Sequence, residues 1–208
     1  MPSRGSRIAN ALVQSKALKF GKFDLKAGVT SPYYIDATWL LSSPKDFKCI
    51  VDIAASEARR ISNSRKVDKM ASIELKGALL LPSIANKLSL PCIVVRKEEK
   101  TYGVTGRIAG GEVKKGEHIL FFDDLVTSAQ SKIEGIKPLE QQGAKVETVL
   151  VLVDREQGGK ENLEKMGYEL IALTTISELV NNLINIKYIS EEQAKLVRDY
   201  VNNTRRLE

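Results

Sequence analysis

Two adjacent carboxylates stand between an apolar run and a turn rich in hydroxyl groups. The apolar run is Ile119 to Phe122, the carboxylates are Asp123 and Asp124, and the turn at 127–131 reads Thr-Ser-Ala-Gln-Ser. If the run is a strand and the turn opens a helix, the carboxylates lie where open α/β sheets bind ligands. The turn then offers hydroxyls and backbone N–H groups at a helix N-terminus, which suits a phosphate. The segment therefore predicts a site for a phosphorylated ribose.

The same segment also has a purely structural interpretation. The acid pair could simply end a strand, and Thr127 and Ser128 could cap the following helix. The segment alone does not decide between the two interpretations. It contains neither the Gly-x-x-x-x-Gly-Lys-Ser/Thr pattern of a P-loop nor the Gly-x-Gly-x-x-Gly fingerprint of a dinucleotide-binding fold.

The elements that would position the acid pair alternate along the chain. Apolar runs without polar alternation are typical of parallel strands that are covered on both faces. Such runs occur at 69–75, 92–96, 118–122, 146–153 and 170–175. Helical periodicity lies between them at 79–88, 131–142 and 159–166. This order predicts an α/β fold with a doubly wound, mainly parallel sheet.

The flanks of this core have their own patterns. We expect an N-terminal helix at 7–18, an extended region broken by Gly28 and Pro32, and a helix at 44–60. Two helices at 177–184 and 190–202 follow the core, and Ser190 with Gln193 resembles a capping box. We expect one domain, 1–208, divided into N-terminal elements at 1–40, a core at 41–175 and C-terminal helices at 176–208.

The stretch at 99–116 differs from the rest of the core. It has five glycines among charged residues and lies between two expected strands. Connections of this length without a core of their own are often functional lids. We therefore expect a mobile loop here.

The composition narrows the class of protein. The 208 residues carry a net charge of +6, but lysines and arginines are spread along the chain, which disfavours a nucleic-acid-binding stripe. No apolar run is long enough to span a membrane, and residues 1–7 lack the apolar centre of a signal peptide, so we expect a cytoplasmic protein without membrane contact. The single histidine, His118, excludes a Ser-His-Asp triad, and Cys49 and Cys92 are expected to be reduced. Leu207-Glu208 could be a cloning remnant.

The segment from Ile119 to Ser131 resembles the donor-binding signature of the type I phosphoribosyltransferases. In that family a hydrophobic strand leads through paired acidic residues into a Thr-rich and Gly-rich turn. The resemblance implies that Asp123 and Asp124 contact ribose hydroxyls of phosphoribosyl diphosphate. It also implies that the 5-phosphate lies in the turn formed by Thr127, Ser128, Ala129, Gln130 and Ser131. The chain departs from the pattern at Ala129 and Gln130, where glycines are usual and where positive φ has a cost for other residues.

Further segments resemble the orotate branch of that family. Phe20 to Asp36 resembles its N-terminal motif, which implies that Lys26 contacts diphosphate or reacting groups and that Tyr33 and Tyr34 flank the base as part of a hood over the pocket. Lys76, in Glu-Leu-Lys-Gly, matches a diphosphate-binding loop. The first of these segments alone could be an ordinary hairpin with exposed lysines and core tyrosines.

Two more segments complete the resemblance. Val95 to Gly103 resembles the mobile catalytic loop, which implies that Arg96, Lys97 and Lys100 stabilise the departing diphosphate. Tyr102 stands where the family usually has a histidine; it could still donate a hydrogen bond. Arg155 matches the arginine that binds the carboxylate of orotate, and its planar guanidinium suits that group.

The resemblance implies a complete reaction. The 5-phosphoribosyl group would pass from phosphoribosyl diphosphate to orotate, giving orotidine 5'-monophosphate and diphosphate, in pyrimidine biosynthesis. Magnesium (Mg2+), held mainly by substrate oxygens and water, is the expected cofactor. A homodimer whose catalytic loop reaches the neighbouring subunit is the expected assembly. Two alternatives stay open: a regulator of the same fold that senses phosphoribosyl diphosphate and binds DNA, and a transferase for another base. Fewer than twenty residues precede Phe20, which disfavours the regulator.

Overall fold

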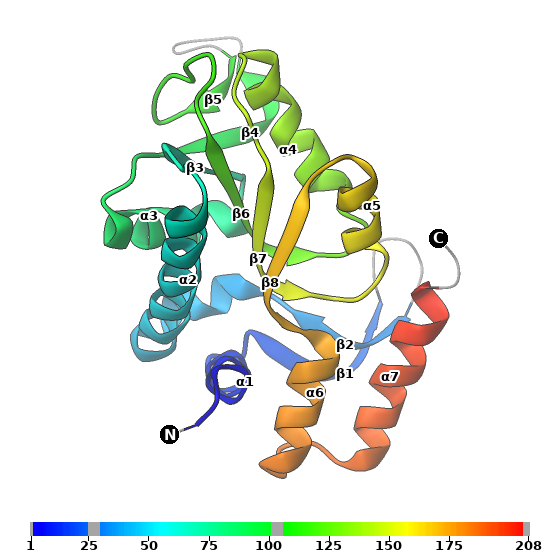
Figure 1. The fold of residues 1–208 in the computed structure, drawn as a ribbon. Helices are drawn as coiled ribbons and strands as arrows, with labels where there is room; N and C mark the ends of the chain where they lie inside the picture. Colours follow the sequence, from blue (N-terminus) through cyan, green and yellow to red (C-terminus); the bar gives the residue numbers. More distant parts are fainter. Residues whose placement is uncertain (1, 25–29, 101–105, 206–208) are drawn as a thin grey trace.

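A six-stranded sheet forms the centre of the molecule (Figure 1). The computed structural model describes residues 2–24, 30–100 and 106–205, without the side chains of residues 100 and 205. The sheet order is β5-β4-β3-β6-β7-β8, and only β5 runs antiparallel to its neighbour. The strands are β3 (Lys69–Ile73), β4 (Cys92–Lys100), β5 (Gly106–Ala109), β6 (Ile119–Val126), β7 (Thr148–Asp154) and β8 (Glu169–Thr175). The predicted α/β class with a mainly parallel sheet is confirmed.

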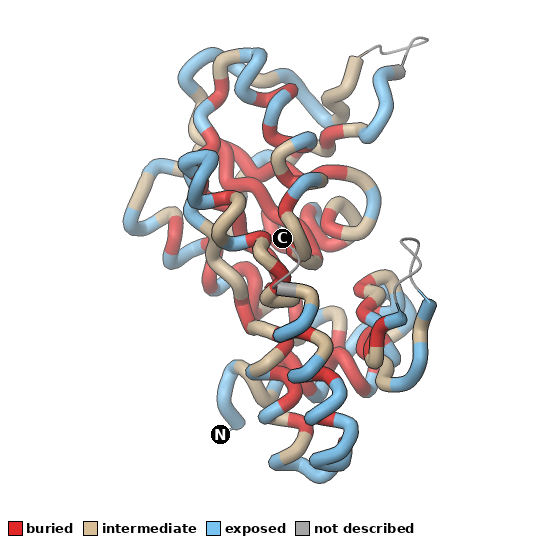
Figure 2. The backbone as a smooth tube through the Cα atoms, turned by 90° about the vertical axis from the view of Figure 1, so that its right-hand side faces the viewer, coloured by how far each residue is buried: buried red, intermediate tan, exposed pale blue. Residues whose placement is uncertain are grey.

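Helices cover both faces of this sheet. Helices α2 (Pro44–Ser64) and α3 (Lys76–Leu88) lie on one side, and α4 (Gln130–Gln141) and α5 (Gly159–Lys165) lie on the other (Figure 1). The core is accordingly in two clusters, with Leu120 and Phe122 in the first and Phe121 in the second. Successive side chains of a strand point to opposite faces, so β6 contributes to both clusters. Figure 2 shows the buried strands between the more exposed helices.

The remaining elements pack at one end of the sheet. Helix α1 (Arg4–Gln14) contacts α2 and α6 (Ile176–Asn185), and β1 (Leu18–Asp24) pairs with β2 (Thr30–Ile35) in a separate hairpin. A 3-10 helix, η1 (Ala37–Ser42), leads from the hairpin into α2. Helix α7 (Glu191–Arg205) lies beside β2. Its start is the predicted capping box, because the Ser190 and Gln193 side chains each accept a backbone N–H of the other residue at 3.1 Å.

Several predicted boundaries were wrong, among them the following three. The N-terminal helix ends at Gln14 instead of Leu18, because Lys16 takes a left-handed φ of 63° that a helix cannot continue. Strand β4 continues to Lys100, and residues 106–109 of the expected loop form β5, so part of that loop is a paired hairpin. Strand β6 continues from Phe122 to Val126, because β7 pairs with it along this length.

Within the described ranges, no helix has the length and apolar character needed to cross a membrane.

Candidate active site

The carboxyl ends of β3 and β6 meet where the winding of the sheet changes direction. From β3 the chain continues to β4 on one side and later returns to β6 on the other. Strand β6 pairs with β3 only as far as Phe121, so Asp123 and Asp124 stand where the two strands separate. Lys76 opens α3 just beyond the end of β3, after a cis peptide bond between Glu74 and Leu75. Such a point is where α/β sheets bind ligands.

Gly77 allows α3 to approach the acid pair. A Cβ atom at this position would lie 2.5 Å from Ser72 Oγ and 2.8 Å from the backbone Cα of Asp123, and it would overlap Asp123 Oδ1. Real Cβ atoms do not tolerate such distances, and the Asp123 backbone cannot move without moving β6. The Lys-Gly pair predicted as a diphosphate-binding loop is therefore also a packing requirement.

We expect Gly77→Ala to destabilise the protein by about 1–3 kcal/mol, because the added methyl group overpacks the contact between α3 and β6. The midpoint of urea unfolding measures this loss. Gly5→Ala in α1 is a matched control, since its Cβ would meet only the end of the Asn182 side chain, at 3.0 Å. Equal midpoints for both variants would contradict the close approach.

Asp124 is buried and only partly satisfied. The residue is 5% exposed, and its Oδ2 atom has no hydrogen-bond partner in the part of the chain that the structure describes. Burial, and next the negative charge of Asp123, raise the pKa of Asp124 to about 7. A buried acceptor without a donor is unusual in proteins. Asp124 is thus ready to accept a hydrogen bond from a ligand hydroxyl.

The hydroxyl-rich turn follows β6 directly. Its third residue, Ala129, has φ 71° and ψ −2°, whereas Gln130 begins α4 and has no positive φ. The cost expected for non-glycine residues in this turn therefore applies at Ala129 alone. Helix α5 braces the turn from behind, since a Cβ on Gly159 would overlap the carbonyl oxygen of Thr127, and Asn162 donates to the Ser128 carbonyl at 3.2 Å.

We expect Ala129→Gly to stabilise the protein by about 0.5–1 kcal/mol, because glycine adopts the left-handed conformation without a Cβ clash. Its greater freedom in the unfolded chain offsets part of the gain. The thermal unfolding midpoint measures the effect. Gln130→Gly is the control and should lose stability, because it adds freedom where φ is ordinary. A loss of stability in both variants would contradict strain at Ala129.

Lys76 links this edge of the sheet to the N-terminal elements. Its Nζ atom lies 3.1 Å from Asp36 Oδ1 and 5.9 Å from the centre of the Tyr34 ring. Burial alone would lower the pKa of Lys76, but the hydrogen bond and charge of Asp36 outweigh it and raise that pKa. Asp124 is among the negative charges that act on Lys76. The lysine is therefore charged, and both acidic groups act on it.

Arg155 lies just beyond the end of β7, beside β6. Its backbone N–H donates to the Val126 carbonyl at 3.0 Å, and its Nε donates to the Tyr33 hydroxyl at 3.0 Å. The guanidinium also lies over the Tyr33 ring, 5.0 Å from its centre. Tyr33 is fully buried and packs edge-on against Tyr200 of α7, with the ring centres 5.9 Å apart. Two aromatic rings therefore back the guanidinium.

Tyr33 and Tyr34 lie on opposite faces of β2, as neighbours in a strand must. Tyr33 faces Arg155 and α7, whereas Tyr34 is 39% exposed and lies against Phe23, with ring centres 5.6 Å apart. The resemblance suggested that the two rings flank one base. The structure places one ring behind Arg155 and the other beside Lys76.

The expected catalytic loop is described only in part. Arg96 donates to the Gly106 carbonyl at 2.9 Å within the β4–β5 hairpin, and the Lys97 backbone N–H donates to Glu74 Oε1 at 2.7 Å. Three predicted contacts with the substrates, those of Lys26, Tyr102 and the Lys100 side chain, lie outside the described residues. Their roles stay predictions.

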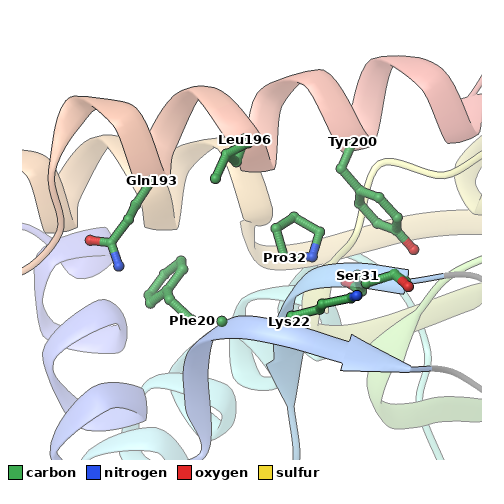
Figure 3. A pocket seen from close by; sticks show the side chains of 9 residues that line it. Phe20, Lys22, Ser31, Pro32, Gln193, Leu196 and Tyr200 are labelled. Carbon is green, nitrogen blue, oxygen red and sulfur yellow. The ribbon is translucent and has the colours of Figure 1, made fainter.

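A separate hollow lies between the β1–β2 hairpin and α7. It has a volume of about 440 Å³, and Phe20, Pro32, Leu196 and Tyr200 contribute apolar atoms to its wall (Figure 3). None of the predicted site residues that the structure describes lines it. Tyr200, which packs against Tyr33, connects this hollow with Arg155.

Sequence reasoning did not assign three residues that complete the site. Asp36 pairs with Lys76, Tyr200 supports Tyr33, and Lys132 pairs with Asp123 at 2.6 Å. Asp36 ends the N-terminal motif quoted above, so its place there was a usable signal. Lys132 directly follows the turn, but a lysine in the first turn of a helix gives no sign of being buried. Nothing in the sequence pointed to Tyr200.

Comparisons with known proteins agree with this geometry. Residues 44–179 match the model of the family described as "Phosphoribosyl transferase domain". Orotate phosphoribosyltransferase from Pyrococcus abyssi is 34% identical over 172 residues, which are 83% of this chain and 93% of that protein. A crystal structure of orotate phosphoribosyltransferase from Aeropyrum pernix is 27% identical, with a TM-score of 0.74, and the match covers 88% of this chain and 99% of that one.

A further solved structure extends the match to almost the whole chain. The UMP synthase of Leishmania donovani has a TM-score of 0.85 and 31% identity, and the match covers 97% of this chain but only 43% of that one. Orotate thus recurs in the names of the relatives, in agreement with Arg155 at the end of β7. The chain belongs to the phosphoribosyltransferase family and, within it, to the orotate phosphoribosyltransferases.

Proposed function

We propose that the chain transfers a 5-phosphoribosyl group from phosphoribosyl diphosphate to orotate, giving orotidine 5'-monophosphate and diphosphate in pyrimidine biosynthesis. One observation carries the proposal: a single edge of the sheet holds a buried acceptor, a turn at a helix N-terminus, a charged lysine and a supported arginine. These are Asp124, the turn at 127–131, Lys76 and Arg155. Together they match the ribose, phosphate, diphosphate and carboxylate of the two substrates.

In this proposal the donor lies across the ends of β3 and β6. Asp124 accepts a hydrogen bond from a ribose hydroxyl. The 5-phosphate lies against Thr127, Ser128, Ala129, Gln130 and Ser131, where the dipole of α4 and the N–H groups of its first turn favour an anion. Lys76 faces the diphosphate, and Asp36 holds its side chain in place. The proposal rests on the position of these groups at the switch point of the sheet.

Orotate lies beside Arg155 in this proposal. A guanidinium and a carboxylate can form two parallel hydrogen bonds, and the contact of Nε with Tyr33 leaves the terminal nitrogens of Arg155 to form them. Tyr33 thus supports the arginine, and we assign Tyr34 to the opposite wall, near Lys76.

Departure of diphosphate requires positive charge. We propose that Lys26, Lys76, Arg96, Lys97 and Lys100 supply it, and that Tyr102 donates a hydrogen bond at the closed site. Magnesium (Mg2+), when bound, neutralises diphosphate oxygens as a hard cation. The site fits this ion because of Asp124. Its free oxygen would accept a hydrogen bond from a ribose hydroxyl, and the oxygen of that hydroxyl could at the same time bind the metal. The protein's part is to orient the ribose and the diphosphate around the ion.

We propose a cytoplasmic homodimer as the working form, with the loop at 99–116 completing the site of the neighbouring subunit. The β4–β5 hairpin stands at an edge of the sheet, where a partner can approach it. Sedimentation equilibrium should give about twice the mass of 23.0 kDa. A monomer that is active at every concentration would contradict the shared site.

The proposed reaction is tested by mixing the purified protein with magnesium, phosphoribosyl diphosphate and orotate, and following the loss of orotate absorbance. We expect turnover that chelation of magnesium abolishes, and no turnover with uracil or adenine in place of orotate. Uracil is the informative comparison, because it lacks the carboxylate that Arg155 binds. Equal rates with uracil and orotate would contradict the assigned acceptor. Binding of a specific DNA sequence without any turnover would favour a regulator instead.

A further inference from the structure

Lys132 is a buried cation within the donor-binding segment. It lies in the first turn of α4, and its side chain is only 8% exposed. Its Nζ atom lies 2.6 Å from Asp123 Oδ2, and the Asp123 side chain is 7% exposed. Nζ also donates to Ser131 Oγ at 3.2 Å, so one ammonium group contacts both the acid pair and the phosphate-binding turn. Buried charges persist in folded proteins when they are paired in this way.

Asp123 has both carboxylate oxygens engaged inside the protein. Oδ2 pairs with Lys132, and Oδ1 accepts the backbone N–H of Asp124 at 2.9 Å. Gly77 packs directly against Oδ1. A carboxylate held in this way by α3, α4 and its own strand has little freedom to turn toward a ligand.

Asp124 keeps a free acceptor, which Asp123 does not. Its side chain lies near that of Asp123, whose charge acts on it, and the charges of Lys132 and of Lys76 act on it as well. Its Oδ2 atom is buried and has no hydrogen-bond partner among the described residues. The two carboxylates therefore share one region of the site but differ in the oxygens that they leave free for a ligand.

We propose that Lys132 is a positioning residue that keeps Asp123 inside the fold, and that Asp124 alone of the pair offers its carboxylate to the ribose. The inference rests on the proposed function and divides the acid pair that the family resemblance treats as equivalent. Asp123 then holds the start of α4, and with it Ser131 of the turn, against the end of β6.

The pair gives an unusual mutational signature. Removal of one partner leaves a buried charge without compensation, whereas removal of both leaves none. Lys132→Met should therefore lower the unfolding midpoint and weaken binding of the donor more than tenfold. The reason is that Asp123, without its partner, must bind water or take up a proton. Lys132→Met combined with Asp123→Asn should restore most of both properties. Lys132→Arg keeps the positive charge, so its unfolding midpoint and its affinity for the donor should lie between those of Lys132→Met and those of the double variant.

The experiment measures binding of magnesium phosphoribosyl diphosphate by calorimetry, without orotate, in the unaltered protein and in five variants. These are Lys132→Met, Lys132→Arg, Asp123→Asn, the double variant and Asp124→Asn. We expect the double variant to bind the donor within threefold of the unaltered protein and Asp124→Asn to bind at least thirtyfold more weakly. Equal losses in the double variant and in Asp124→Asn would overturn the division, because Asp123 would then also serve the ribose.

Unfolding midpoints give a reading that does not depend on the reaction. The effects of Lys132→Met and Asp123→Asn must be strongly non-additive if the pair acts as a unit. Additive effects would overturn the positioning role even if the donor binds. Failure of the unaltered protein to bind the donor would overturn the proposed function instead, with the midpoints still reporting on the pair. If Lys132→Met does not fold, Lys132→Arg and the double variant still provide both readings.

Discussion

Replacement of Arg155 by alanine should raise the Michaelis constant for orotate about a hundredfold and change that for phosphoribosyl diphosphate less than threefold. Loss of one partner of a hydrogen-bonded charge pair typically costs about 2–5 kcal/mol. The cost falls on orotate, because Arg155 lies beyond β7, whereas the proposed donor contacts lie at the ends of β3 and β6. Steady-state kinetics with each substrate varied in turn measures the split. Equal effects on both constants would remove Arg155 from the carboxylate role.

Two variants sharpen this prediction. Arg155→Lys keeps the charge but loses both the planar fork and the bond to the Tyr33 hydroxyl, so it should recover only a small part of the lost affinity. Arg198→Ala in α7 is the matched control, because Arg198 is exposed and contacts Asn181, away from the site. It should leave both constants unaltered.

Replacement of Asp124 by asparagine should stabilise the folded protein at pH 8 while it weakens donor binding. The pKa of Asp124 is raised from 3.8 to about 7 in the folded state, mainly by burial. An acid whose pKa is raised in the folded state contributes stability that is fully present below its pKa in the unfolded chain. This stability is lost as the pH rises through its pKa in the folded state. We therefore expect a gain on the order of 3–4 kcal/mol at pH 8 and less than about 1 kcal/mol at pH 4. Urea unfolding across this range measures the gain.

The sign of the pH dependence is the decisive part of this prediction. Asp52→Asn is a suitable comparison, because hydrogen bonds from Lys48 and Lys87 lower the pKa of Asp52. That variant should lose stability at neutral pH and approach the unaltered protein as the pH falls through the lowered pKa. A gain for Asp124→Asn that is the same at pH 4 and pH 8 would show that packing of the amide, and not relief of a buried charge, is responsible.

The order of elements could be predicted because parallel strands that are buried on both faces leave an obvious apolar pattern. The same pattern predicted that Asp123 and Asp124 follow a strand at the functional edge, whereas the switch point depends on the strand order, which the structure supplies. The ends of the elements could not be predicted as well. Strand β6 continues past Phe122 because β7 pairs with it, and residues 106–109 form β5 because β4 pairs with them. Pairing of this kind depends on neighbours in space, which a local pattern does not reveal.

Side-chain partners were harder to predict than side-chain positions. The sequence shows a lysine after the turn but not that its ammonium group is buried against Asp123. It shows Tyr33 and Tyr34 as a pair, although their alternation in a strand already implies opposite faces. It gives no sign that Tyr200, more than 160 residues away in the chain, packs against Tyr33. These contacts depend on how α7 and the β1–β2 hairpin dock, and that is a property of the whole fold.

The stack of Arg155, Tyr33 and Tyr200 has a consequence for how new specificities can arise. Tyr33 and Tyr200 both lie outside the stretch at 44–179 that matches the family model, whereas Lys76, Asp124 and the turn lie within it. In the proposed site, the support of Arg155 therefore comes partly from segments outside the family match. We expect that changes in the hairpin and in α7 can alter the choice of base without touching the groups proposed for the ribose.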